Sequence, residues 1–403
     1  MVMLSAFLMV VQALRIFSFG IFLKPISLEF GWGRGEISGA YAIGMFTTGC
    51  FAILSGKASD KYGPRVLVTI GGALCAAGFF LLSRINAIWQ VYVIWGLFMG
   101  LGGSLFFIPI TSTILRWFAR HRGAAVALTG AGFGFGGIIS PPLAQLLIST
   151  YGWRTTYVIL SIITIVTVTP LAQLLKQSPE RAGIRAYGAE PDIENEEERE
   201  RNPGSGDFSF TEAVKTGRFW FFGFMQFCFF SCLQVVLVHI NPYALDIGIP
   251  ALTAATIVSF ISASSTIGRI ATGFISDRVG GKPMLVICLI VSTLALIWLL
   301  FTGQIWMFYL FAAVFGLAYG GMVTLIAIVS AELFGLKSFG MIFAGLMLVS
   351  ITGEAMGAPM AGVIFDVTGS YRLAFFICIA LCSMAILFSL LILRYGRKQA
   401  GSS

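Results

Sequence analysis

Hydrophobic residues run along this chain in long blocks that short polar segments separate. Turn and charge signals divide the chain into twelve apolar stretches, each near the ~20 residues that a helix needs to cross a bilayer. No stretch has the period-two alternation of barrel strands. The pattern therefore predicts an all-α membrane protein with twelve transmembrane helices. The expected spans are 3–29, 36–56, 66–85, 88–115, 123–149, 155–176, 218–243, 252–275, 284–303, 305–332, 339–365 and 372–394.

The composition supports this interpretation, and the placement of basic residues orients the chain. Only 11% of residues are charged, against about 25% in a soluble domain. Of the 26 lysines and arginines, 19 lie after even-numbered spans or at the C-terminus, four lie after odd-numbered spans, and three lie inside spans. The positive-inside rule then places both termini in the cytoplasm. The net charge of +8 reflects topology and not a nucleic-acid partner. We expect a multi-pass protein that functions as a monomer in a cell membrane, and the short loops favour a bacterial inner membrane.

The chain's beginning and its cysteines carry no further signal. Met1 enters an apolar stretch directly, without the basic segment and small-residue cleavage site of a secretory signal. All seven cysteines lie in apolar segments, where cysteine packs as a small residue. Their spacing offers no disulfide or metal framework. We therefore predict no metal and no cofactor.

A repeat divides the chain into two related halves. The segment "GKASDKYGPR" (56–65) and the segment "GFISDRVGGK" (273–282) both read G-x-x-x-D-[KR]-x-G-x-[KR], 217 residues apart. The polar stretch between spans six and seven has too little apolar surface to pack and is expected to be a cytoplasmic loop, with a short helix as an alternative. The predicted units are bundles of six helices at 1–176 and 218–403, joined by 177–217. Further landmarks repeat at the same offset, or within one residue of it: Pro25 with Pro242, Glu29 with Asp246, Gly123 with Gly340, Pro142 with Pro359, and Arg154 with Arg372.

The duplicated loop signature and the six-plus-six organisation resemble the major facilitator superfamily over the whole chain. Within it, three segments resemble the monocarboxylate transporters and the oxalate:formate exchangers: "FSFGIFLKPISLEFGWGRGEIS" (17–38), "RWFARHRGAAVALTGAGFGFGG" (116–137) and "DVTGSYRLAF" (366–375). The resemblance implies a secondary transporter that works by alternating access.

The loop signature has a predicted gating role, with simple helix capping as the alternative. Its aspartate can clamp neighbouring helices through a helix end or an arginine, and its first glycine can let helices approach closely. Small residues in "GAGFGFGGIISPP" (130–142) and "GEAMGAP" (353–359) predict sliding surfaces between the halves, and the paired prolines at 141 and 142 permit a bend. The candidate gating residues are Gly56, Asp60, Arg65, Gly273, Asp277 and Arg278.

Arg269 is the strongest candidate for a binding residue. It lies eight residues before Asp277, or ~12 Å deeper along the same helix. An arginine at such depth costs ~2.5–3.5 kcal/mol to insert, and it usually faces a cavity. A structural ion pair is the alternative, but a guanidinium can also grip a carboxylate through two parallel bonds. The resemblance implies the second role, because an arginine in this span binds the substrate carboxylate of monocarboxylate transporters. Tyr319 could add its hydroxyl or simply pack.

A proton-coupled carrier also needs a group that titrates. Animal relatives carry an aspartate four residues before this arginine, but here Ser265 occupies that position. Asp246, after the Pro242 bend, is the first substitute, with a loop carboxylate or helix cap as the alternative. If Asp246 lies too far from Arg269, Glu354 takes the role, because a carboxylate in hydrocarbon without a cation within one turn can carry a proton. A structural pair with Arg15 or Lys24 is the alternative for Glu354. His239 titrates in a suitable range, and packing is its alternative.

The charge count separates two transport hypotheses. Oxalate:formate exchangers carry a second cation, a lysine, in span eleven, whereas residues 339–365 contain no lysine or arginine. Arg15, deep in span one, could be a second cation. We predict proton-coupled symport of a small monocarboxylate such as L-lactate or pyruvate, with anion exchange as the alternative. A membrane enzyme or a transporter-like sensor fits less well, because the chain has only two histidines, no catalytic motif and no stretch long enough for a cytoplasmic domain.

Overall fold

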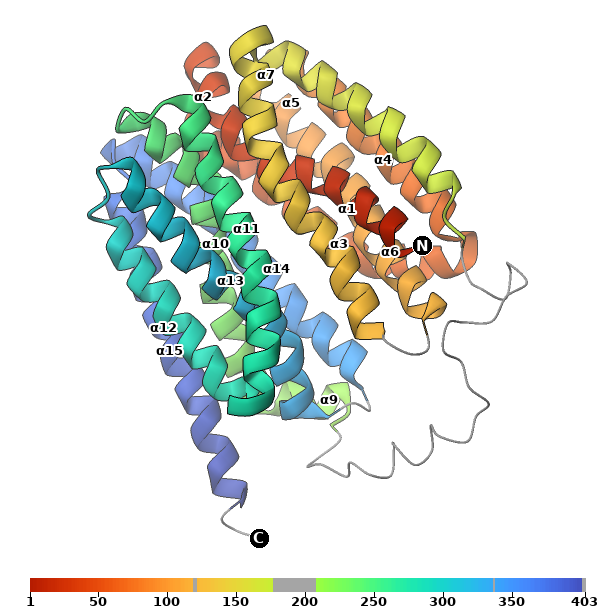
Figure 1. The fold of residues 1–403 in the computed structure, drawn as a ribbon, viewed down its shortest axis with the longest axis vertical. Coiled ribbons are helices and arrows are strands. Elements are labelled where there is room, and N and C mark those ends of the chain that lie inside the picture. The colour runs from red at the N-terminus through yellow and green to blue at the C-terminus, as the bar shows by residue number, and fades with distance from the viewer. Residues whose placement is uncertain (119–121, 177–207, 336–337, 401–403) are drawn as a thin grey trace.

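The computed structural model describes residues 1–118, 122–176, 208–335 and 338–400, and every regular element in them is a helix. Figure 1 shows two bundles lying side by side, one in red to yellow and one in green to blue. The first bundle contains α1 (Val2–Phe17), α2 (Phe19–Phe30), α3 (Arg34–Tyr62), α4 (Pro64–Leu82), α5 (Ile88–Val93), the π-helix η1 (Ile94–Leu101), α6 (Gly102–Trp117) and α7 (Arg122–Gln173). The second contains α9 (Phe210–Lys215), α10 (Gly217–Asp246), α11 (Ala251–Val279), α12 (Gly281–Leu299), α13 (Ile305–Phe334), α14 (Phe339–Thr368) and α15 (Arg372–Ala400).

The described helices account for the twelve expected crossings. Ten stretches are long and apolar enough to span a membrane. One of them, 128–173, crosses twice because α7 bends at Gly152. The helix α3 adds the remaining crossing with its 29 residues. Residues 177–207 of the predicted cytoplasmic loop lie outside the described part of the chain, and α9 follows them.

The duplication seen in the sequence is repeated in the backbone. Glycines with positive φ end or interrupt helices at matched positions of the two halves, and their φ values agree closely. Glycine has no Cβ and therefore adopts this conformation without steric cost. The matched pairs, each 217 residues apart, are Gly31 and Gly248 (69° and 88°), Gly63 and Gly280 (84° and 91°), and Gly152 and Gly369 (78° and 67°).

Each half has its own hydrophobic core. One buried cluster lies almost wholly in residues 8–175, and it gains only Val238, Ala255 and Ala358 from the second half. The other lies almost wholly in residues 213–392, with Ala13 and Phe17 from the first half. The few shared members lie where the bundles meet. Separate cores allow each half to move as a body, which supports the predicted division of the chain.

Small residues of α7 bring the two halves into close contact. A Cβ placed on Gly137 would lie 2.5 Å from Ser262 Oγ on α11, and one placed on Gly134 would collide with Thr266. Ser259 also donates its hydroxyl to the carbonyl of Ile138 at 2.6 Å. Gly134 and Gly137 therefore line a contact between the halves, as the sequence predicts, whereas Gly132 and Gly136 pack against α1 of the same half.

Two details of the packing differ from the prediction. Gly353 and Gly357 lie against the backbone of Phe227 and Ser231 on α10, inside the second half, whereas Ala358 of the same segment belongs to the core cluster of the first half. The helix α7 also runs through the paired prolines at 141 and 142, and its non-helical residue is Gly152. A proline only removes one helical hydrogen bond, whereas Gly152 adopts φ 78°, which ends the helical path.

Candidate functional site

Arg269 lies beside Tyr319, the other residue that the sequence offers as a substrate ligand. The Cζ atom of Arg269, on α11, is 6.0 Å from the centre of the Tyr319 ring on α13. Tyr319 is buried, and its hydroxyl lies within interaction range of the guanidinium. Arg269 Nε is buried without a hydrogen-bond partner, and no ion pair to Arg269 occurs among the described residues. A guanidinium in this state has donors available for a ligand.

A carboxylate also lies near Tyr319. Glu354, near the middle of α14, is half-buried and close enough to Tyr319 to affect it electrostatically. It also interacts with Gln234 of α10, which in turn reaches Tyr41 of α3. This row of side chains leads from the second half into the first. Gln234 and Tyr41 escaped the sequence analysis, because an amide and a tyrosine inside apolar spans carry no distinctive pattern.

Arg15 is a second deeply buried cation. Its side chain is 2% exposed, and its Nε and Nη1 atoms have no hydrogen-bond partner. The guanidinium lies against Gly103 of α6, where an added Cβ would be 2.5 Å from Nη2. Its nearest titratable neighbours are Cys75 and Tyr41. The structure therefore connects Arg15 to the row through Tyr41, and the predicted role as a second cation stays a prediction.

Asp246 occupies a different place from the one its predicted role requires. Its carboxylate binds Arg34 of α3 through two bonds of 2.6 and 3.0 Å, and it also binds Lys24 of α2 at 2.9 Å. Arg269 lies 18 residues along α11 from its first residue, Ala251, or ~27 Å deeper by helix rise. Asp246 is thus remote from Arg269 and already neutralised by two cations. Glu354 is the better placed candidate for the proton.

His239 is fully buried and satisfied by its neighbours. Its Nε2 lies 2.7 Å from the carbonyl of Ala358, so this nitrogen donates, because a carbonyl can only accept. Nδ1 then accepts from the Tyr371 hydroxyl at 3.1 Å, and that oxygen accepts from Arg34 Nη1 at 2.8 Å. The arrangement matches the packing alternative for His239. Its contact with Tyr371 also supports the side chain of Arg34.

The predicted gating loops are only partly described. Arg65 Nε donates to the carbonyl of Leu175 at 3.4 Å, and Arg278 is exposed. The expected close approach at Gly56 is absent, because an added Cβ would meet only Ile108 at 3.5 Å. Gly273 has nothing within 4 Å of an added Cβ. The side chains of the two signature aspartates, Asp60 and Asp277, lie outside the described part of the structure.

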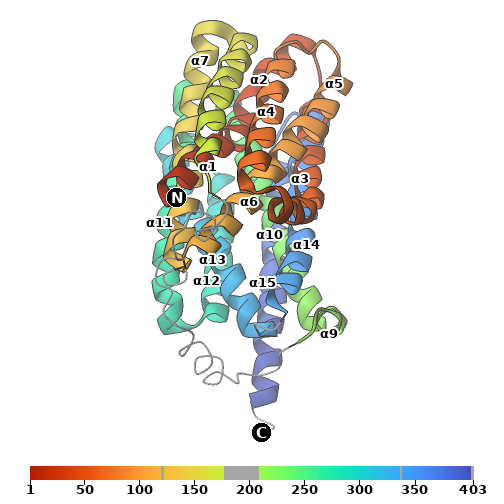
Figure 2. The ribbon, with the colours of Figure 1, turned by 90° about the vertical axis from the view of Figure 1, so that its right-hand side faces the viewer.

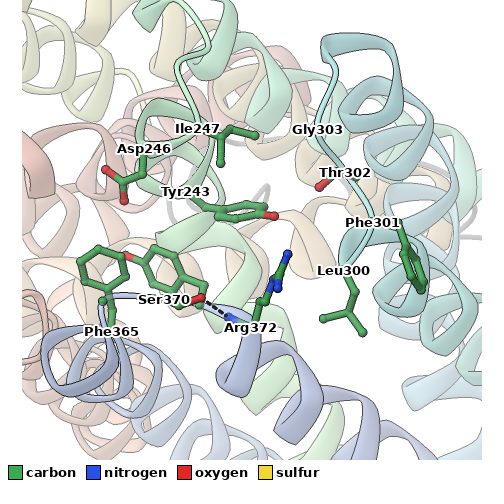
Figure 3. Close-up of a pocket in the computed structure, with 12 residues that line it drawn as sticks. Tyr243, Asp246, Ile247, Leu300, Phe301, Thr302, Gly303, Phe365, Ser370 and Arg372 are labelled. Carbon is green, nitrogen blue, oxygen red and sulfur yellow. Dashed lines mark hydrogen bonds between the residues drawn. The ribbon is translucent and has the colours of Figure 1, made fainter.

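An open cavity lies away from the row of side chains around Tyr319. It measures about 590 Å³ and lies between the end of α10, the α12–α13 connection and the α14–α15 connection (Figure 3). Among the described residues, no group of three or more histidine, cysteine or acidic side chains could hold a metal ion. All seven cysteines are free thiols.

Two related six-helix bundles, with a row of polar and charged side chains that leads from one bundle into the other, are the architecture of a secondary transporter. The family profile "Major Facilitator Superfamily" matches residues 5–282 and 246–403, so the chain belongs to this superfamily of transporters. Its spanning helices make it a multi-pass membrane protein.

Within the superfamily, the chain is similar to several individual transport proteins. The chain is 29% identical to monocarboxylate transporter 13 of Bos taurus, over 93% of this chain and 84% of that protein. It is 24% identical to monocarboxylate transporter 11 of Mus musculus, over 90% of this chain and 79% of that protein. An agnestins efflux protein of Paecilomyces divaricatus is 27% identical over 83% of this chain and 73% of its own length.

Solved structures support the fold. One is a bacterial homologue of the human lysosomal transporter Spinster in an inward-facing and occupied conformation, with a TM-score of 0.77, 14% identity and coverage of 98% of this chain and 96% of that chain. Another is the nucleoside transporter NupG, with a TM-score of 0.75, 12% identity and coverage of 97% and 99%. At these identities the likeness establishes the fold and not the substrate.

Proposed function

We propose that this protein carries a small monocarboxylate such as L-lactate or pyruvate across the membrane together with a proton. The observation that carries the proposal is the Arg269 guanidinium, which lies beside Tyr319 without a carboxylate partner among the described side chains. A half-buried arginine without a counter-ion suits an anionic ligand. The similarity to monocarboxylate transporters supports a carboxylate as that anion.

In this mechanism Arg269 binds the substrate carboxylate through two parallel hydrogen bonds, and Tyr319 offers its hydroxyl to the same ligand. Glu354 carries the proton. When the carrier is empty, the ionised Glu354, which has Tyr319 as a neighbour in common with Arg269, balances the field of the guanidinium. Protonation of Glu354 removes this negative charge, so the substrate anion binds more tightly. Proton and substrate therefore bind together and leave together.

Anion exchange is the second candidate, and Arg15 favours it. A second buried cation, inside the first half and without a counter-ion among the described residues, would suit a substrate with two negative charges. In that case the carrier would need an anion on the opposite side of the membrane instead of a proton gradient.

One experiment on purified protein in liposomes separates the two candidates. Radiolabelled lactate uptake is measured with an imposed inward proton gradient and no internal anion, and then with internal lactate and no gradient. Symport predicts concentrative uptake in the first condition, which a protonophore abolishes. Uptake only in the second condition would refute symport and establish exchange.

A further inference from the structure

Two aspartates of the second half close one end of the interface. This end carries the connections after odd-numbered spans, which the basic residues place outside the cell, and we call it the outer end. Asp246 binds Arg34 and Lys24 of the first half. Asp366, on α14, accepts from the backbone N–H groups of Arg34 and Gly35 at 2.8 and 2.7 Å. The outer end of α3 is thus held through both a side chain and the backbone.

The first half contains the repeat equivalent of Asp246, and it pairs differently. Glu29 binds Arg154 at 2.9 Å. Both residues belong to the first half and move with it. Arg154 also donates to the carbonyls of Ser83 at 3.0 Å and Ile85 at 3.2 Å. This pair closes nothing between the halves.

The second half has an aspartate and an arginine at the positions equivalent to Glu29 and Arg154, but these two residues do not pair with each other. Asp246 corresponds to Glu29, Arg372 to Arg154, and Leu300 and Thr302 to Ser83 and Ile85. All four residues of the second half line the cavity of about 590 Å³. Figure 3 shows the Arg372 side chain turned into this cavity, with Asp246 on the other side of Tyr243. Among the described residues, the Arg372 guanidinium has no hydrogen-bond or ion-pair partner.

We propose that Arg372 is a second, alternating partner of Asp246, and that the outer end opens when Asp246 transfers from Arg34 and Lys24 to Arg372. In the closed state the aspartate joins the halves. In the open state it forms the pair that Glu29 and Arg154 form permanently in the other half. Arg372 is thus a positioning residue for the gate.

The physical reason is the cost of separating charges. Opening the outer end removes both cations from Asp246, which is 24% exposed in its side chain and makes three bonds to them. A partly buried carboxylate that loses its partners is destabilised. A waiting guanidinium in an adjacent cavity replaces them, so that both arrangements satisfy the aspartate. Two discrete packings of similar energy are what a switching element requires.

The test measures the outer end directly and needs no substrate. Trp89 on α5 and Trp306 on α13 are exposed positions near the outer end, 62% and 56% accessible, one in each half. Replacing both with cysteine, in a Cys50→Ser background, allows two spin labels to be attached. Pulsed electron–electron double resonance then measures the distance between the two labels and gives the populations of the closed (short-distance) and open (long-distance) states in the purified carrier.

The variants follow a double-mutant scheme. Arg34→Gln removes a closed-state partner and is expected to raise the open-to-closed ratio about tenfold, since a hydrogen bond to a charged group is worth ~1.5–3 kcal/mol. Adding Arg372→Gln should lower the open-to-closed ratio most of the way back to the wild-type value. Adding Arg372→Lys instead should leave the raised ratio unchanged. Arg154→Gln is the matched control and should leave the ratio unchanged, because its pair lies inside one half.

The proposal stands if the open population of Arg34→Gln depends on a cation at position 372. It fails if Arg34→Gln and the double variant with Arg372→Gln give the same populations, or if Arg154→Gln changes the ratio as strongly as Arg372→Gln. Because no substrate is present, failure here leaves the proposed monocarboxylate transport untouched, and failure of that transport leaves this result standing.

Discussion

Truncation of Arg269 is the sharpest test of the proposed site. Arg269→Ala removes the guanidinium from a half-buried position, and Arg269→Lys keeps the charge but loses the planar fork. Among the described residues, the other titratable neighbours of Tyr319 are Tyr41 and the acidic Glu354, so the structure offers the substrate no replacement cation there. A bound carboxylate would therefore face a tyrosine and a carboxyl group without a positive charge beside it.

The expected loss follows from the contacts that disappear. Removing one partner of a hydrogen-bonded charge pair costs about 2–5 kcal/mol when the pair is buried. Because Arg269 is only half-buried, the lower part of this range applies, about 2–3 kcal/mol. That weakens lactate binding by ~30- to 150-fold for Arg269→Ala. Arg269→Lys should lose about tenfold, since one of two charge-assisted bonds remains.

Isothermal titration calorimetry of the purified variants with lactate at fixed pH measures these losses. Gel filtration and thermal unfolding establish that the variants fold. Arg84→Ala is the matched control, because Arg84 is an exposed arginine on the connection after α4. Wild-type lactate affinity in a folded Arg269→Ala variant would refute the assignment of Arg269 to the substrate.

Three further predictions concern the proton, the charge count and the interface. Glu354→Gln should abolish proton-driven uptake and retain counterflow, whereas Asp246→Asn alters the outer gate and not the proton site, so it should change uptake and counterflow by the same factor in liposomes. Oxalate and malonate should compete with lactate less well than pyruvate does, because a second carboxylate would lose water without a matching cation. Gly137→Val should slow transport, because overpacking against Ser262 costs about 1–3 kcal/mol, while Gly130→Ala, with no neighbour within 4 Å of its added Cβ, should transport normally.

Each of these predictions has an opposing result. Normal proton-driven uptake by both Glu354→Gln and Asp246→Asn would show that neither carboxylate carries the proton. Stronger competition by oxalate than by pyruvate would make Arg15 a substrate ligand and favour exchange. Unchanged transport in Gly137→Val would show that the α7–α11 contact does not limit the movement of the halves.

The sequence by itself determined the architecture. Long apolar blocks have one stable solution in lipid, so twelve helices follow from hydropathy alone. The 217-residue offset predicted two related bundles, and the matched positive-φ glycines repeat it in the backbone. Arg269 also stood out by itself, because a cation so far from water is costly unless it has a function. Its place beside Tyr319 depends on the packing of α11 against α13, which α12 separates in the sequence.

Only the tertiary structure decided which charges meet. Glu29 and Asp246 are repeat equivalents, yet Glu29 pairs within its own half and Asp246 pairs with Arg34, 212 residues away. Nothing in the repeat predicts this difference, because the second half has alanine at the position equivalent to Arg34, and the contact depends on how two bundles lean together. Hydropathy and spacing describe each helix alone. Partners across an interface are fixed by the geometry of the closed state, whereas the packing inside the second half brings both Arg269 and Glu354 to Tyr319.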